Sequence, residues 1–106
     1  MLVAFSVAPS GTGRADGSVH DAVAAAVRIV RASGLPHRTT SMFTEIEGEW
    51  DEVMDVVKRA TDAVLAYGSR ASLVLKADIR PGFTGELDAK IDRLGAALAD
   101  EDDAAR

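Results

Sequence analysis

The sequence predicts an α+β protein with the ferredoxin-like βαββαβ arrangement, a four-stranded antiparallel sheet and an additional C-terminal helix. Several segments have the period of two or the propensity of strands, and three longer segments carry apolar residues at helical spacing. Right-handed crossovers then place two helices on one face of the sheet. The chain of 106 residues has room for one domain, which we assign to residues 1–99, followed by a disordered acidic tail at residues 100–106.

The first predicted strand covers residues 2–8, where valine and phenylalanine alternate with small side chains. A loop begins at Pro9 and leads to the first predicted helix, for which Ser18 is a natural N-cap. Valine and alanine follow at helical spacing. Gly34 is suited to the position after the helix end, and Pro36 prevents the helix from continuing.

Two further strands are predicted over residues 37–42 and 43–48, where threonine, phenylalanine and isoleucine favour extended structure. No Asn-Gly or Asp-Gly pair marks a hairpin turn between them. One long bent strand therefore remains an alternative.

The second predicted helix covers residues 50–67 and ends at Gly68. Its apolar stripe consists of Val53, Val57, Ala60, Val64 and Tyr67. Acidic residues gather at its start and basic residues follow, as the helix dipole favours. We expect Trp50, at the start of this helix, to be an anchor in the core.

The last predicted strand covers residues 71–79, and the third predicted helix covers residues 86–99. The strand presents one face made of Leu73, Leu75, Ala77 and Ile79. The helix carries Leu87, Ile91, Leu94 and Leu98 at coiled-coil-like spacing. Pro81 and Gly82 separate the two elements.

One face of the predicted sheet has no helix to cover it. We expect it to present polar and charged side chains, namely Ser41, Thr44, Glu45, Glu47, Lys76, Asp78 and Arg80. A solvated face is one interpretation, since antiparallel sheets often have one. The small apolar residues of the first strand favour a sheet-to-sheet contact between copies of the chain. Buried charges there need partners, and the expected pairs are Lys76 with Glu45 or Glu47, and Asp78 with Arg80.

Composition excludes several classes of function. The chain has no cysteine, which excludes disulfides, thiolate metal sites and thiol catalysis. Its net charge of −5 argues against nucleic acid, whose phosphates require a basic patch. The apolar N-terminal stretch is too short for a signal peptide or a membrane span, so we expect a cytoplasmic protein with no membrane partner.

The sequence shows no arrangement of residues typical of catalysis or metal binding. His20 and His37 lack the spacing of metal ligands, and the glycine-containing loop at residues 11–13 lacks the lysine of a phosphate-binding loop. We therefore expect no enzyme activity, no catalytic residue, no metal and no cofactor. A small enzyme of ferredoxin-like fold is the least favoured alternative.

Several motifs occur in a fixed order along the chain. The opening strand runs into Pro9-Ser10-Gly11-Thr12, and the first helix ends in Ser33-Gly34-Leu35. Residues 42–48 read Met-Phe-Thr-Glu-Ile-Glu-Gly before an acidic helix start, and the last strand ends in Lys76-Ala77-Asp78-Ile79-Arg80. This ordered set resembles the MTH1187/YkoF-like thiamine-binding protein family over nearly the whole chain.

The resemblance implies the fold predicted above, homodimers joined through their sheets and often paired into homotetramers, and no catalytic activity. The ligand it implies is thiamine or its hydroxymethylpyrimidine moiety. An aminopyrimidine needs hydrogen-bond acceptors and donors and an aromatic or apolar plate, and the cationic ring of thiamine is favoured by carboxylates and aromatic faces. The candidates are Glu47 as acceptor, Thr44 and Ser41 as donors or acceptors, Phe43 as the stacking plate, and Ser10 and Thr12 as closing residues from the loop.

Three of these candidates have structural alternatives. Glu47 is equally suited to pairing with Lys76, Thr44 to an ordinary strand position, and Phe43 to the core. At the level of the whole protein, the main alternative is a regulatory or scaffolding oligomer that binds another protein or a different metabolite.

Overall fold

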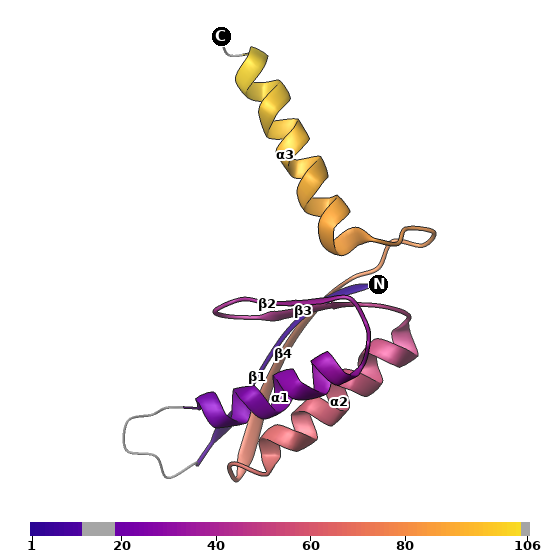
Figure 1. The fold of residues 1–106 in the computed structure, drawn as a ribbon. Coiled ribbons are helices and arrows are strands. Elements are labelled where there is room, and N and C mark those ends of the chain that lie inside the picture. Colours follow the sequence, from indigo (N-terminus) through magenta and orange to yellow (C-terminus); the bar gives the residue numbers. More distant parts are fainter. Residues whose placement is uncertain (12–18, 105–106) are drawn as a thin grey trace.

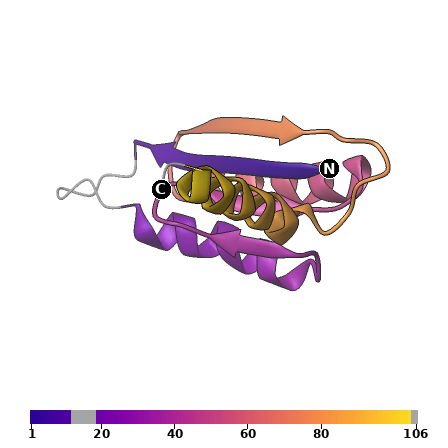
Figure 2. The same ribbon diagram turned by 90° about the horizontal axis from the view of Figure 1, so that it is seen from above.

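The computed structural model describes residues 1–11 and 19–104, with residues 101–104 described as backbone only. Its elements are β1 (Leu2–Ser10), α1 (His20–Ala32), β2 (His37–Thr39), β3 (Thr44–Glu47), α2 (Trp50–Leu65), β4 (Arg70–Asp78) and α3 (Glu86–Ala104). The four strands form one antiparallel sheet in the order β2-β3-β1-β4. α1 and α2 lie together on one face, and α3 rises from the other side (Figure 1; Figure 2). The predicted ferredoxin-like α+β fold is confirmed.

The register of the strands separates the two faces of the sheet. β1 pairs with β4 from Leu2↔Asp78 to Ser10↔Arg70, and with β3 from Leu2↔Glu47 to Phe5↔Thr44. Val3, Phe5 and Val7 face α1 and α2 and are buried. Because side chains alternate along a strand, the residues between them lie on the other face, which we call the open face.

Small aliphatic side chains fill the core between the sheet and the helices α1 and α2. Its buried members are Val3, Phe5, Val7, Ala22, Ala26, Val30, Ile46, Val53, Val56, Val57, Ala60 and Val64. The sequence predicted such a core, because only 5% of the residues are aromatic. The open face has no comparable layer over it.

The segment between α1 and α2 forms a hairpin of two short strands, which excludes the single bent strand. Both strands are shorter than predicted, and Thr40 closes the turn between them. The Thr40 N–H donates to the Phe43 carbonyl oxygen at 2.8 Å, and the Phe43 N–H donates to Thr40 Oγ1 at 3.3 Å. A threonine hydroxyl therefore does here what an Asn-Gly pair does in tighter hairpins.

The C-terminal end of α1 is as predicted, but its N-terminal end is not. Gly34 follows the helix with a φ of 76°, in the left-handed region that favours glycine. At the other end Val19 occupies the N-cap position before His20. The expected N-cap, Ser18, lies outside the described residues.

Two aromatic side chains predicted to be buried in or against α2 are exposed. Trp50 is the first residue of the helix and is 55% exposed. Side chains on a helix point towards its N-terminus, so the first one projects past the end of the helix instead of onto the sheet. Tyr67 is 44% exposed because α2 ends at Leu65, before the predicted stripe is complete.

α3 is longer than predicted and stands away from the body of the molecule (Figure 1). The helix continues past the predicted end at residue 99 to Ala104, through a segment expected to be disordered. Alanine is the strongest helix former and is frequent here, which favours the continuation. Of its predicted apolar stripe, Leu87 is buried against the sheet, whereas Ile91, Leu94 and Leu98 are each more than half exposed.

The turn between α2 and β4 depends on the absence of a side chain at Gly68. A Cβ atom at this position would lie 2.4 Å from the carbonyl oxygen of Ser10, which also accepts a hydrogen bond from the Ser69 N–H. We expect Gly68→Ala to destabilise the protein by about 1–3 kcal/mol and to lower the melting temperature by several degrees. Thermal unfolding followed by circular dichroism measures this shift.

Gly95→Ala provides the matched control, because nothing lies within 4 Å of a Cβ atom there. Its melting temperature should equal or exceed that of the unsubstituted protein, since alanine favours helix. Equal melting of the Gly68→Ala variant and the unsubstituted protein would contradict the steric argument.

Candidate functional site

The first turn of α3 is bound to the open face by the carboxylate of Glu47. Glu47 Oε2 accepts a hydrogen bond from the Glu86 N–H at 2.9 Å, and Oε1 accepts one from the Leu87 N–H at 3.1 Å. The Glu47 side chain is 7% exposed. The first N–H groups of a helix have no partner within the helix, and the helix dipole favours an anion at that end. Glu47 therefore fixes the start of α3 over the sheet.

Two ion pairs connect α3 to the outer strands of the sheet. Arg38 on β2 donates to Asp88 at 2.5 Å, and Lys90 donates to Asp78 on β4 at 2.6 Å. The Lys90 hydrogen bond and charge lower the pKa of the Asp78 carboxyl below its ordinary value of 3.8. Because the pKa of Asp78 is lowered, the ion pair stabilises the folded protein at neutral pH. This stabilisation is lost only in acid, as the pH falls from 3.8 through the lowered pKa and the carboxylate is protonated.

The pairs predicted from the sequence are different from those observed. Asp78 pairs with Lys90 of α3 instead of with Arg80, whose guanidinium lies 3.6 Å from the ring centroid of Phe83. Glu47 binds backbone N–H groups instead of Lys76. The predictions were wrong because they placed no element of the same chain over the open face.

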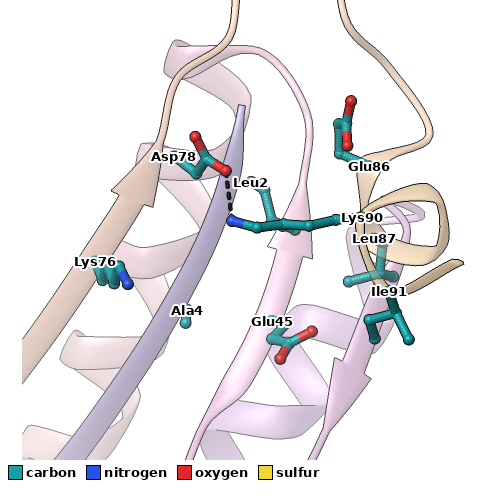
Figure 3. Close-up of a pocket in the computed structure, with 9 residues that line it drawn as sticks. All are labelled: Leu2, Ala4, Glu45, Lys76, Asp78, Glu86, Leu87, Lys90 and Ile91. Carbon is teal, nitrogen blue, oxygen red and sulfur yellow. Dashed lines mark hydrogen bonds and ion pairs between the residues drawn. The ribbon is translucent and has the colours of Figure 1, made fainter. Parts of the chain in front are cut away.

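Between α3 and the open face lies a hollow of about 210 Å³, which we call the α3 pocket (Figure 3). Its lining residues are Leu2, Ala4, Glu45, Lys76, Asp78, Glu86, Leu87, Lys90 and Ile91. Leu2 and Ala4 of β1 form the floor, and Leu87 and Ile91 of α3 form an apolar wall (Figure 3). The Lys90 side chain reaches from α3 across Leu2 to Asp78 (Figure 3).

Opposite charges flank the floor of the α3 pocket in one row across the sheet. Ala4 is paired with Glu45 on one side and with Lys76 on the other. On its far side Glu45 is paired with Arg38, whose guanidinium already donates to Asp88 and to the Leu87 carbonyl. Within the part of the chain that the structure describes, neither Glu45 nor Lys76 has a hydrogen bond or an ion pair.

Glu86 supplies a third carboxylate to the lining of the α3 pocket, beside Glu45 and Asp78. One of its oxygens, Oε2, accepts a hydrogen bond from Arg93 at 2.5 Å. The other, Oε1, is buried and has no hydrogen-bond partner among the described residues. Leaving a buried carboxylate oxygen without a partner costs free energy.

The α3 pocket therefore combines an apolar floor and wall with one carboxylate, that of Glu45, which has no partner among the described residues. Apolar lining with a few polar groups is the usual make-up of a small-molecule site. Because Glu45 is half-buried, its charge is screened less than that of a surface carboxylate. The arrangement suits a small ring that carries an amino group or a positive charge.

Three of the predicted site residues lie together, but in another hollow. Ser41, Phe43 and Thr44 line a space of about 280 Å³ between α1 and the β2–β3 hairpin. Phe43 is 37% exposed and so is not a core residue. Thr44 pairs with Phe5 and faces α1 and α2, which corrects its predicted place on the open face. This hollow offers hydroxyl groups and an aromatic ring, and none of the described residues that line it is charged.

The other three predicted site residues, Ser10, Thr12 and Glu47, are not among the described residues that line this hollow. Ser10 is exposed at the end of β1 distant from Glu47, whose strand partner is Leu2. Glu47 is engaged with α3, and Thr12 lies outside the described residues. The roles of all six residues in ligand binding stay predictions.

A larger hollow, of about 370 Å³, lies beside the start of α2 and the loop before α3. Three carboxylates line it, and each already has a partner. Glu47 accepts from the N–H groups of Glu86 and Leu87, Asp88 pairs with Arg38, and the Glu49 side chain accepts from a backbone N–H in the first turn of α2. The α3 pocket is the stronger candidate, because its lining includes the carboxylate of Glu45, which has no partner among the described residues.

Residues 1–11 and 19–104 offer neither a cluster of metal ligands nor a long apolar helix. Within these ranges no group of three or more His, Asp or Glu side chains could hold a metal ion. None of the helices described there combines the length and the apolar character needed to cross a membrane.

One protein family and several known proteins are similar to this chain over most of its length. The profile of a family described as thiamine-binding protein matches residues 3–95. A UPF0045 protein of Mycobacterium bovis is 51% identical over 92 residues, covering 86% of this chain and 87% of the relative. A UPF0045 protein of Synechocystis is 39% identical over 69 residues, covering 65% of this chain and 54% of the relative.

Two solved structures share the fold over most of their length. A hypothetical protein of Methanocaldococcus jannaschii has a TM-score of 0.79 and 29% identity, covering 89% of this chain and 94% of the other. A Thermotoga maritima protein, whose name refers to thiamine biosynthesis or salvage, has a TM-score of 0.70 and 27% identity, covering 84% of this chain and 94% of the other.

Proposed function

The chain belongs to the thiamine-binding protein family, and from this premise we propose that it is a non-catalytic, homo-oligomeric protein that binds thiamine or its hydroxymethylpyrimidine moiety in the α3 pocket. The observation that carries the proposal is the half-buried carboxylate of Glu45, which has no partner among the described residues and lies beside the apolar floor at Ala4. Both ligands present an aminopyrimidine, whose amino group donates hydrogen bonds and whose ring suits apolar walls. The Thermotoga maritima relative, named for thiamine biosynthesis or salvage, supports the same ligand class.

Titration calorimetry with thiamine and with hydroxymethylpyrimidine tests the proposal. We expect saturable binding of one ligand per chain and a higher melting temperature in the presence of ligand. We expect the ligand to be recovered chemically unchanged after incubation, as a non-catalytic binding role requires. Folded protein that gives neither heat nor a shift in melting temperature at millimolar ligand contradicts the proposal.

The homo-oligomer is proposed because one copy of the chain leaves the α3 pocket partly open and apolar residues of α3 exposed. The α3 pocket of about 210 Å³ lies below the roughly 300–1,000 Å³ typical of sites that enclose a drug-sized ligand. Ile91, Leu94 and Leu98 continue its apolar wall along α3 and are more than half exposed. A second copy against this stripe would bury these residues and help to enclose the ligand.

Leu94→Glu tests the oligomer. A charge buried in an apolar contact costs several kcal/mol, so we expect association to weaken roughly a hundredfold or more. Size-exclusion chromatography with light scattering should show a dimer or tetramer for the unsubstituted chain and a smaller species for the variant. Leu65→Glu is the control, since Leu65 is similarly exposed but lies on α2, on the opposite side of the sheet. A monomer of the unsubstituted chain at micromolar concentration contradicts the oligomer.

A further inference from the structure

The α3 pocket has a lysine on one side of its floor and a glutamate on the other. This arrangement of charges indicates which groups, besides an aromatic ring, its ligand carries. Glu45 and Lys76 stand on opposite sides of Ala4 in the same row of the sheet. Their Cα atoms are two interstrand spacings apart, about 10 Å. Side chains on one face of a sheet stand roughly perpendicular to it, so the space above the small Ala4 side chain lies between the two charged groups.

The lysine on this row has no fixed partner. Lys76 has no hydrogen bond or ion pair within the described residues, whereas Lys90, the other ammonium of the lining, is held by Asp78 at 2.6 Å. Lys76 contributes only a weaker electrostatic influence on Asp78. A ligand in the pocket therefore meets a free ammonium group on the side of β4 and a free carboxylate on the side of β3.

We propose that the α3 pocket is selective for the phosphate monoester of its ligand, with the phosphate bound by Lys76 and the amino-bearing ring by Glu45. This inference rests on the proposed function. Thiamine and hydroxymethylpyrimidine each carry a primary alcohol, and phosphorylation of that alcohol gives a molecule with a hydrogen-bond donor at one end and an anion at the other. Such a molecule matches both flanks of the pocket, whereas the free alcohol leaves Lys76 without a partner. Lysine is a common phosphate ligand in proteins.

Titration calorimetry compares each phosphate monoester with its unphosphorylated parent. We expect the ester to bind at least about tenfold more tightly, since hydrogen bonds between charged groups are stronger than those between neutral ones. In the Lys76→Gln variant the ester should lose this advantage and bind no more tightly than the parent binds to the same variant. Raising the salt concentration should weaken binding of the ester more than binding of the parent.

Lys58→Gln is the matched control, because Lys58 is exposed on α2, on the other side of the sheet. This variant should keep the preference for the ester, and circular dichroism should show that both variants are folded. A preference that survives Lys76→Gln but disappears in Lys90→Gln would overturn the assignment to Lys76.

The outcomes separate this inference from the proposed function. Equal binding of parent and ester by the unsubstituted protein overturns the inference and leaves the proposed function standing. Absence of binding by either molecule overturns both. Inorganic phosphate alone should bind weakly, and an affinity for it equal to that of the ester would show that the ring is not recognised.

Discussion

Glu47→Gln is expected to release the start of α3 from the sheet. The carboxylate accepts hydrogen bonds from the N–H groups of Glu86 and Leu87, and a glutamine side chain has only one oxygen to replace the two. The amide NH2 group of the glutamine is a donor and would point at one of the two backbone N–H groups, which are donors as well. One N–H group at the start of α3 is then left without a hydrogen-bond acceptor. We expect the docking of α3 to lose about 2–4 kcal/mol.

Hydrogen–deuterium exchange resolves this effect along the chain. Exchange of the amides of α3 should become at least about tenfold faster, while the amides of β1, β3 and α2 keep their protection. Glu45→Gln is the matched control, because it makes the same change on the same strand and face but at a carboxylate without a partner among the described residues. Unchanged exchange at residues 86 and 87 would contradict the role assigned to Glu47.

Glu45→Gln is expected to have the largest effect on ligand binding. Glutamine keeps the shape of the side chain but removes the charge, so the interaction with the amino group or positive charge of the ligand weakens. We expect the affinity for thiamine to fall roughly tenfold to a hundredfold, the range given by loss of a charged hydrogen bond. Titration calorimetry measures this fall, and the melting temperature without ligand should stay the same.

Two further variants make this result specific. Asp62→Asn removes a similar charge from an exposed position on α2 and should leave the affinity unchanged. Phe43→Ala alters the hollow between α1 and the hairpin, and it should also leave the affinity unchanged. Loss of binding in Phe43→Ala with normal binding in Glu45→Gln would place the ligand in that hollow instead.

Periodicity in the sequence was sufficient to predict the faces of the sheet. The alternation of Val3, Phe5 and Val7 identified the face that α1 and α2 cover, and the register with β4 confirms it. The same alternation shows why the predicted site residues cannot all line one pocket. Thr44 and Glu47 are three residues apart on one strand, an odd separation, so their side chains must lie on opposite faces.

The residues that complete the α3 pocket could not be predicted from local signals. Glu86 and Lys90 belong to α3, and nothing in their neighbourhood in the sequence says that this helix begins over the open face. That position depends on Glu47, which lies 39 residues before Glu86 and binds it through the backbone. The sequence did predict part of the lining, because it placed Glu45, Lys76 and Asp78 on the uncovered face beside the small residues of the first strand.

The place of β1 inside the sheet has a consequence for the order in which the protein folds. β1 is the first strand to be synthesised, yet one of its two neighbours is β4, the last strand, and Leu2 pairs with Asp78. Until β4 leaves the ribosome, β1 must remain an edge with unpaired N–H and C=O groups. Contacts so distant in sequence slow folding, and an unpaired edge is a site of aggregation during that delay. The nascent chain is therefore most vulnerable before the last strand is complete.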